Sequence, residues 1–201
     1  MKHIFIKNNP SHPTLVLFHG TGGDEYDLVS IAKEIDDKAS ILSLRGSVNE
    51  NGLNRFFKRI KPGVFDEEDL RKQSLDIIAF LKAHIKTYNL DDTNIIALGY
   101  SNGANIISSI LLHDPTLFKG ALLHHPMVPY KHMEVPSLNK KAIFIAAGEN
   151  DPICDKDEPI KLKALYEEKG ADVTLTWYYQ GHQLTELEIQ DAKAWYKTHC
   201  I

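Results

Sequence analysis

The sequence predicts an α/β fold in which a doubly wound, mostly parallel sheet is flanked by helices. Short apolar runs of strand length alternate along the chain with segments whose apolar residues recur at helical spacing. Some of these runs are apolar at every position, which is typical of strands covered on both faces in a parallel sheet. A third observation is a G-x-S-x-G turn between one such run and an apolar helical segment.

Length and composition indicate a single domain over residues 1–201. The chain is 43% hydrophobic and 25% charged, values typical of a globular protein with a sizeable core. The formal net charge is −4 and no basic block is present, which argues against nucleic acid and anionic membranes as partners. The sequence is compatible with either a monomer or a homodimer.

The sequence shows no pattern typical of export. Its first apolar run is too short for a signal peptide, and no stretch reaches the length of a membrane span. The two cysteines, Cys154 and Cys200, make no disulfide framework. We therefore expect a cytoplasmic protein.

The first part of the chain is expected to hold three strands and one helix. Residues 3–6 suit an edge strand, and residues 14–18 form a continuous apolar run that suits a buried strand. Apolar residues at helical spacing predict a helix over 28–35, and residues 40–44 predict the next strand.

Residues 45–66 show no clear periodicity and are predicted to form a long irregular loop. Such loops are uncommon inside a compact domain and are often functional. A helix is expected over 66–88, where apolar side chains recur at helical steps. Four acidic residues occupy its first turn, and we interpret them as favourable charges at the helix N-terminus rather than as a metal site.

The G-x-S-x-G turn spans residues 99–103, between a strand predicted at 94–98 and a helix predicted at 104–112. This is the arrangement of a nucleophile elbow, with chance as the alternative explanation. So tight a turn strains the backbone of its central residue, and the two glycines remove side chains that would collide. Ser101 is therefore predicted to present its hydroxyl as a nucleophile.

The remaining elements complete the alternating pattern. Strands are predicted at 120–124, 141–147 and 173–178, and helices at 162–170 and 189–196. In a parallel sheet the carboxyl ends of the strands share one edge, and ligands bind there.

Three polar side chains follow strands on this edge, in the order Ser101, Asp151, His182. This is the order expected with a nucleophile elbow. A serine hydroxyl needs a base, so neutral His182 is predicted to take its proton and later return it to the leaving group. Asp151 is predicted to orient the imidazole and to stabilise its charged form.

Asp151 is preferred as the acid because Asn150 and Pro152 put it at the apex of a turn. The alternatives are the acidic residues close to it in the sequence, which are Glu149, Asp155 and Asp157. We interpret Cys154, which has no elbow around it, as a packing residue.

The glycine-rich turn after residues 14–18 is predicted to contribute to an oxyanion hole. It matches neither of the common phosphate-binding glycine motifs, although a phosphate cradle is the alternative. With this type of elbow, one donor comes from the residue after the nucleophile and the other from the loop after an early strand. The backbone N–H groups of Thr21 and Asn102 are the candidates.

Four residues are candidates for substrate contact. Arg45 stands at a strand end, where it holds either a substrate anion or an internal carboxylate. Phe56 and Phe57 either line a substrate pocket or anchor a surface loop in the core. His125, next to His124, either touches substrate or belongs to an ordinary polar loop.

Ten histidines raise the question of a metal site. No H-E-x-x-H motif or similarly tight ligand spacing is present. We therefore expect neither a metal nor a cofactor.

With these motifs in hand, the chain resembles the α/β-hydrolase superfamily. Within it, the chain is similar to the small phospholipase/carboxylesterase and dienelactone-hydrolase-like group, and most similar to small bacterial hydrolases associated with methylhydroquinone response. The chain departs from these relatives at two places. Dienelactone hydrolases use a cysteine as the nucleophile, where this chain has Ser101. Acyl-protein thioesterase relatives carry Phe and Gln beside the nucleophile, where this chain has Tyr100 and Asn102. The stretches that carry the resemblance are residues 19–24, 45–70, 99–103, 125–127, 148–152 and 181–182.

The resemblance and the residues together predict a carboxylic-ester hydrolase with an α/β-hydrolase fold and no large cap domain. The partner would be a small-molecule ester, hydrolysed through an acyl-enzyme. Because no long insertion suggests a cap, we expect a shallow site and short acyl chains. The alternatives are a thioesterase and a non-catalytic small-molecule binder with this fold.

Overall fold

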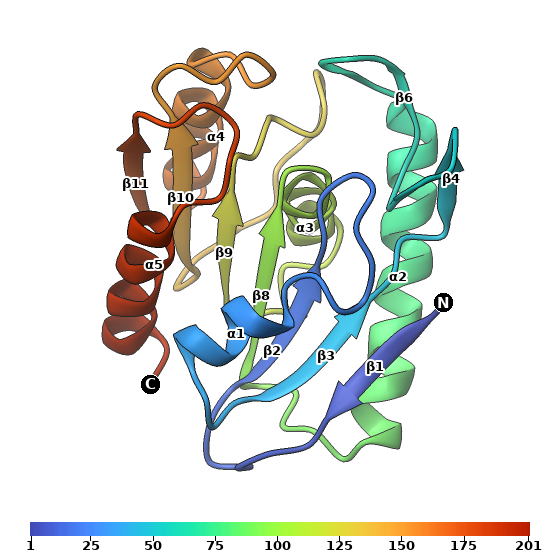
Figure 1. The fold of residues 1–201 in the computed structure, drawn as a ribbon, viewed down its shortest axis with the longest axis vertical. Coiled ribbons are helices and arrows are strands. Elements are labelled where there is room, and N and C mark those ends of the chain that lie inside the picture. Colours follow the sequence, from blue (N-terminus) through green and yellow to red (C-terminus); the bar gives the residue numbers. More distant parts are fainter.

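A computed structural model describes all residues, 1–201, and is built on one seven-stranded sheet (Figure 1). The strand order is β1-β3-β2-β8-β9-β10-β11, and every neighbouring pair is parallel except β1 with β3. The mostly parallel doubly wound sheet is therefore confirmed. Its strands are β1 (His3–Ile6), β2 (Thr14–Phe18), β3 (Ser40–Leu44), β8 (Ile95–Tyr100), β9 (Gly120–His124), β10 (Ala142–Gly148) and β11 (Asp172–Tyr178).

Helices cover both faces of the sheet. One face packs against α1 and α5, and the other against α2, α3 and α4, as Figure 1 shows. The helices are α1 (Val29–Ile35), α2 (Glu67–Thr87), α3 (Asn102–His113), α4 (Asp157–Glu168) and α5 (Glu186–His199). None of them is both long enough and apolar enough to cross a lipid bilayer.

The alternation of side chains along each buried strand divides the interior into two cores. In β2, Val16 and Phe18 join the larger core under α2, α3 and α4, whereas Leu15 and Leu17 join the smaller core under α1 and α5. Successive side chains of a strand point to opposite faces of the sheet. A central strand must therefore be apolar at every position, which is the pattern the sequence shows.

The predicted irregular loop over residues 45–66 is wrong in one respect. The segment forms two short hairpins, β4 (Val48–Glu50) with β5 (Leu53–Arg55), and β6 (Arg59–Lys61) with β7 (Val64–Phe65). Asn51 and Gly52 join the first pair, and both have positive φ, 53° and 89°. An Asn-Gly pair favours this two-residue turn because both residues tolerate the left-handed conformation. Gly63, with φ of 75°, lies in the turn of the second hairpin.

The long helix α2 agrees with its prediction. Asp66 caps its N-terminus by accepting a hydrogen bond from the Asp69 backbone N–H at 3.1 Å. No large cap domain covers the sheet edge where the parallel strands end, at the top of Figure 1. Residues 45–66 lie beside that edge instead.

Candidate active site

Ser101 stands between β8 and α3 in a strained backbone conformation, with φ of 52° and ψ of −113°. Residues other than glycine seldom adopt positive φ, and such strain persists only where the surroundings enforce it. A Cβ atom on Gly103 would lie 1.9 Å from the carbonyl oxygen of Phe18, so only glycine lets α3 approach β2 this closely. The sequence motif therefore folds into the elbow because its glycines permit contact between backbones.

Ser101, His182 and Asp151 form one hydrogen-bonded chain, although they lie far apart in the sequence. The Ser101 hydroxyl donates to His182 Nε2 at 2.7 Å, and His182 Nδ1 donates to Asp151 Oδ2 at 2.6 Å. The Tyr100 hydroxyl donates to the His182 carbonyl at 2.6 Å and holds that loop against the elbow. Such a chain can carry a proton from the serine hydroxyl to the imidazole.

The other acids considered for this position lie elsewhere. Glu149 accepts a hydrogen bond from the exposed Lys156 at 2.6 Å, and Asp155 accepts one from the Asp157 backbone N–H at 2.9 Å. Of these carboxylates only Asp151 reaches His182.

Asp151 also accepts a hydrogen bond from a second histidine. His125 Nδ1 lies 3.1 Å from the same Oδ2 atom that His182 contacts. On the far side of His125, Nε2 lies 3.4 Å from Glu188 Oε2, and His124 Nδ1 lies 2.5 Å from Glu188 Oε1. His182 thus lies against a buried cluster of two carboxylates and two further histidines.

The charges in this cluster stabilise one another. Burial opposes a charge on His125, but its contacts with Asp151 and Glu188 outweigh burial and raise its pKa to about 9. Burial likewise opposes ionisation of Asp151, but hydrogen bonds from the two histidines and from the N–H groups of Cys154 and Ile153 hold its pKa well below the usual range. Glu188 behaves in the same way, with a pKa of about 2.

His125 lies on the wall of a cavity beside Ser101, so its contact with substrate stays a prediction. Its side chain is only 1% exposed, and both ring nitrogens face carboxylates. Of its two ring nitrogens, Nδ1 is hydrogen-bonded to Asp151, and Nε2 lies 3.4 Å from Glu188 Oε2. Sequence reasoning missed Glu188, which lies on α5. That helix carries many polar residues, and the sequence does not distinguish a buried carboxylate from the exposed ones.

The two expected oxyanion donors lie at the same site. Asn102 is the first residue of α3, so its N–H has no acceptor within the helix. The Thr21 N–H has no hydrogen-bond partner in the protein either. Side-chain contacts hold both residues in place, because Asn102 Oδ1 accepts from the Phe56 N–H at 2.7 Å and Thr21 Oγ1 accepts from Arg55 Nη1 at 2.6 Å.

A cavity of about 290 Å³ opens in front of the serine, and we call it the Ser101 cavity. It is lined by Ser101, His182, Thr21, Asn102, Arg55, Arg59, Gly63, Phe65, Tyr100, Asn105, His125, Met127 and Ile153. Arg55, Arg59 and Phe65 come from the hairpin segment. The sequence indicated that this segment could line a substrate pocket, but as an irregular loop; the Asn-Gly turn was the signal that predicts a hairpin there.

Arg45, Phe56 and Phe57 do not line this cavity, which corrects their prediction as substrate contacts. Arg45 binds internal carboxylates, with Nη2 3.1 Å from Asp24 Oδ2 and Nε hydrogen-bonded to Glu25. Phe56 and Phe57 are at most 1% exposed and belong to the larger core. In each case the structural alternative is the one observed.

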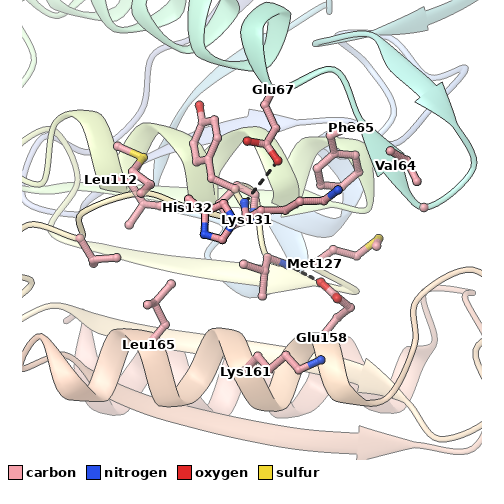
Figure 2. A pocket seen from close by; sticks show the side chains of 16 residues that line it. Val64, Phe65, Glu67, Leu112, Met127, Lys131, His132, Glu158, Lys161 and Leu165 are labelled. Atoms are coloured by element: carbon pink, nitrogen blue, oxygen red, sulfur yellow. Dashed lines mark hydrogen bonds between the residues drawn. The ribbon is translucent and has the colours of Figure 1, made fainter.

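A second cavity, of about 540 Å³, adjoins the first and is shown in Figure 2. It shares Gly63, Phe65 and Met127 with the Ser101 cavity, and we call it the side pocket. Apolar side chains from α3, α4 and the chain after β9 form most of its wall, including Leu112 and Leu165. At its rim, carboxylates from α2 and α4 accept backbone hydrogen bonds, Glu67 from Lys131 and Glu158 from Val128, and so hold the segment between them.

One group of side chains has the spacing of a metal site, namely His125, Asp151 and His182. Both histidines face a single carboxylate oxygen through Nδ1, at 3.1 and 2.6 Å. Those distances are hydrogen bonds in which each Nδ1 carries a proton, whereas a metal ligand must offer a lone pair. The geometry fits a charge network better than a metal site.

Comparison with known proteins shows the family to which the chain belongs. Residues 1–200 match the phospholipase/carboxylesterase family. The chain is 46% identical over 197 residues to the putative hydrolase MhqD of Bacillus subtilis strain 168, and the match covers 98% of each protein. The Bacillus cereus carboxylesterase superposes with a TM-score of 0.97 at 50% identity, over 99% of this chain and 94% of that one. The structure of YahD with malic acid gives a TM-score of 0.94 at 32% identity, over 98% of both chains.

Proposed function

Because the chain belongs to the phospholipase/carboxylesterase family and is an esterase-type hydrolase, we propose that it cleaves carboxylic esters with Ser101 as the nucleophile. The acyl group of the ester passes to Ser101 Oγ, and water then releases it. No metal or cofactor takes part.

In this mechanism His182 removes the Ser101 proton as Oγ attacks the ester carbonyl, and it then gives that proton to the departing alcohol. Asp151 keeps the Nδ1 proton on the imidazole and stabilises the positive charge that forms on it. The N–H groups of Thr21 and Asn102 stabilise the oxyanion of the tetrahedral intermediate. A water molecule repeats the same steps on the acyl-enzyme and regenerates the serine.

The observation that carries this proposal is the hydrogen-bonded chain of 2.7 and 2.6 Å from Ser101 through His182 to Asp151. A binding protein needs no such chain. The strained backbone of Ser101 costs free energy, and such strain is typically retained at functional sites. These features favour catalysis over the alternative of a non-catalytic binder.

We propose small or short-chain acyl esters as substrates. The Ser101 cavity, about 290 Å³, suits molecules of a few carbon atoms, and the related YahD structure contains malic acid, a small carboxylic acid. The side pocket would admit longer chains only past Phe65 and Met127. Activity on p-nitrophenyl esters should therefore fall as the acyl chain grows from acetate to decanoate, and a matched series of thioesters tests the thioesterase alternative.

The decisive test replaces Ser101 by Ala and measures hydrolysis of p-nitrophenyl acetate with a chelator present throughout. We expect turnover to fall by several orders of magnitude, because the nucleophile is lost. The matched control is Ser137→Ala, which alters an exposed serine away from the Ser101 cavity and should leave the rate unchanged.

Three outcomes would contradict the proposal. A folded Ser101→Ala protein with near-native turnover would remove the serine from the mechanism. A wild-type rate abolished by the chelator would indicate a metal-bound hydroxide. Wild-type protein that cleaves no ester or thioester in the panel would favour the binder.

A further inference from the structure

The charged side chains on the wall of the Ser101 cavity are unbalanced. Arg55 and Arg59 both line it, whereas no aspartate or glutamate does. His125, also in the wall, has its charge already opposed by Asp151 and Glu188. The two guanidinium groups are therefore the charges that a substrate in this cavity would meet.

The protein supplies only one carboxylate to these two arginines. Glu50 lies between them, with Oε1 3.0 Å from Arg59 Nε and Oε2 3.4 Å from Arg55 Nε. Both guanidinium groups carry a permanent positive charge, so one unit of charge is left without a partner.

Several N–H donors of these guanidinium groups are also unused. Arg55 donates through Nε to the Phe57 carbonyl and through Nη1 to Thr21 Oγ1, at 3.1 and 2.6 Å. Its Nη2 has no acceptor in the protein, and neither Nη1 nor Nη2 of Arg59 has one. Two guanidinium groups with open donors on the wall of one cavity can bind the two oxygens of a carboxylate side by side.

Burial makes this imbalance of charge costly. The Arg55 side chain is only 4% exposed, and a buried charge needs a partner. Burial, followed by the repulsion of Arg59, lowers the pKa of Arg55 from its ordinary value, and Glu50 offsets only part of this effect. An anion at this position would relieve the repulsion between the two arginines.

Resting on the proposed ester hydrolysis at Ser101, we propose that the substrates are carboxylate-bearing esters, whose free carboxylate binds Arg59 and Arg55 while the ester group lies at Ser101. The one unbalanced charge suits a monoanion better than a doubly charged phosphate. The small volume of the cavity requires the carboxylate and the ester to be only a few atoms apart. Half-esters of short dicarboxylic acids have these properties, and their hydrolysis with one water yields the dicarboxylate, an alcohol and one proton.

The experiment compares a charged ester with a neutral ester of similar length, monoethyl glutarate and ethyl pentanoate, by following proton release at constant pH. Wild-type protein is expected to prefer the charged ester in kcat/KM. Arg59→Met removes the more exposed guanidinium and is expected to lower the ratio of the two kcat/KM values by about 10- to 100-fold, as for the loss of a charged hydrogen bond. Activity on ethyl pentanoate is the reference that corrects this ratio for any general effect of the substitution on turnover.

The matched control is Lys61→Met, which removes a positive charge from the same strand, β6, but from a residue outside the cavity wall. It should leave the ratio unchanged. An Arg59→Met protein with an unchanged ratio would overturn the proposal and give the arginines a purely structural role in holding the hairpins.

A binding measurement separates this proposal from the proposed mechanism. Calorimetry with Ser101→Ala protein should detect binding of monoethyl glutarate that is lost in the Ser101→Ala, Arg59→Met double variant. If wild type cleaves no ester but this Arg59-dependent binding is present, the mechanism fails and the carboxylate site stands. If esters are cleaved but the half-ester binds equally well without Arg59, the mechanism stands and the carboxylate site is wrong.

Discussion

A single carboxylate oxygen, Asp151 Oδ2, accepts hydrogen bonds from two histidines of different character. His182 connects it to the serine, whereas His125 connects it to the buried Glu188. The rings of the two histidines lie 5.0 Å apart, and the Tyr100 ring lies 5.9 Å from that of His125. A charged His125 would keep Asp151 ionised.

The first prediction concerns the pH dependence of stability. His125 has a folded-state pKa of about 9, above its ordinary value of 6.5, so its contribution is complete below pH 6.5 and is lost as the pH rises through 9. Replacing it by Asn, which tolerates the positive φ of 56° at this position, removes that contribution. Between pH 7 and pH 9.5, wild type should lose roughly 2 kcal/mol more of its unfolding free energy than His125→Asn does.

Urea denaturation of both proteins at the two pH values makes this measurement. Lysines, tyrosines and cysteines also titrate in this range. Their contributions to the change in unfolding free energy are common to both proteins and cancel in the difference. Equal losses in wild type and variant would mean that His125 is neutral in the folded protein. In that case Asp151 would owe its ionisation to His182 and the backbone N–H groups alone.

At the scale of elements, the hairpin segment 48–65 has two sides. Phe56 packs against Phe18 of β2 in the larger core, with ring centroids 5.3 Å apart, while Arg55, Arg59 and Phe65 line the Ser101 cavity. The segment can do both because Phe56 lies in the bend between the two hairpins, whereas Arg55, Arg59 and Phe65 lie on their strands. The segment therefore ties the wall of the cavity to the core of the sheet.

The second prediction separates these two sides with a pair of variants. Phe56→Ala should lower the unfolding free energy by about 3–5 kcal/mol and leave the relative rates on short and long p-nitrophenyl esters unchanged. Phe65→Ala, at a half-buried residue that both cavities share, should change those relative rates more than it changes stability. Denaturation curves and a chain-length panel on both variants check this. The reverse pattern would return Phe56 to the substrate-binding role suggested by its place in the sequence.

At the scale of the whole molecule, one sheet connects all the helices. Strands β2, β8 and β9 contribute side chains to both cores, so neither core can open without exposing the other. No linker divides the chain into units. We therefore propose that residues 1–201 form a single domain.

The third prediction follows from this connection. Thermal unfolding followed by circular dichroism, which averages over all helices, should coincide with unfolding followed by the fluorescence of Trp177 and Trp195, which lie on β11 and α5. Two separate midpoints would mean that the C-terminal part unfolds on its own. A midpoint that rises with protein concentration would indicate a homodimer.

The sequence by itself determined the local structure and the order of the proposed catalytic residues. Periodicity placed the strands of the main sheet and the five helices, because burial on one or two faces leaves a repeat that can be read along the chain. The G-x-S-x-G motif can also be read locally, although Gly103 is needed because α3 packs closely against the Phe18 carbonyl of β2. Since the carboxyl ends of parallel strands meet at one edge, the order Ser101, Asp151, His182 then predicted a shared site.

Only the tertiary structure decided which partner each polar or aromatic side chain meets. Arg45 and Arg59 are both arginines near strand ends, yet Arg45 lies against Asp24 and Glu25 while Arg59 lines the cavity. Glu188 has an ordinary helical position in the sequence but is fully buried against two histidines. These outcomes depend on contacts between residues distant in the chain, and a local repeat carries no information about the side chains that will stand opposite it.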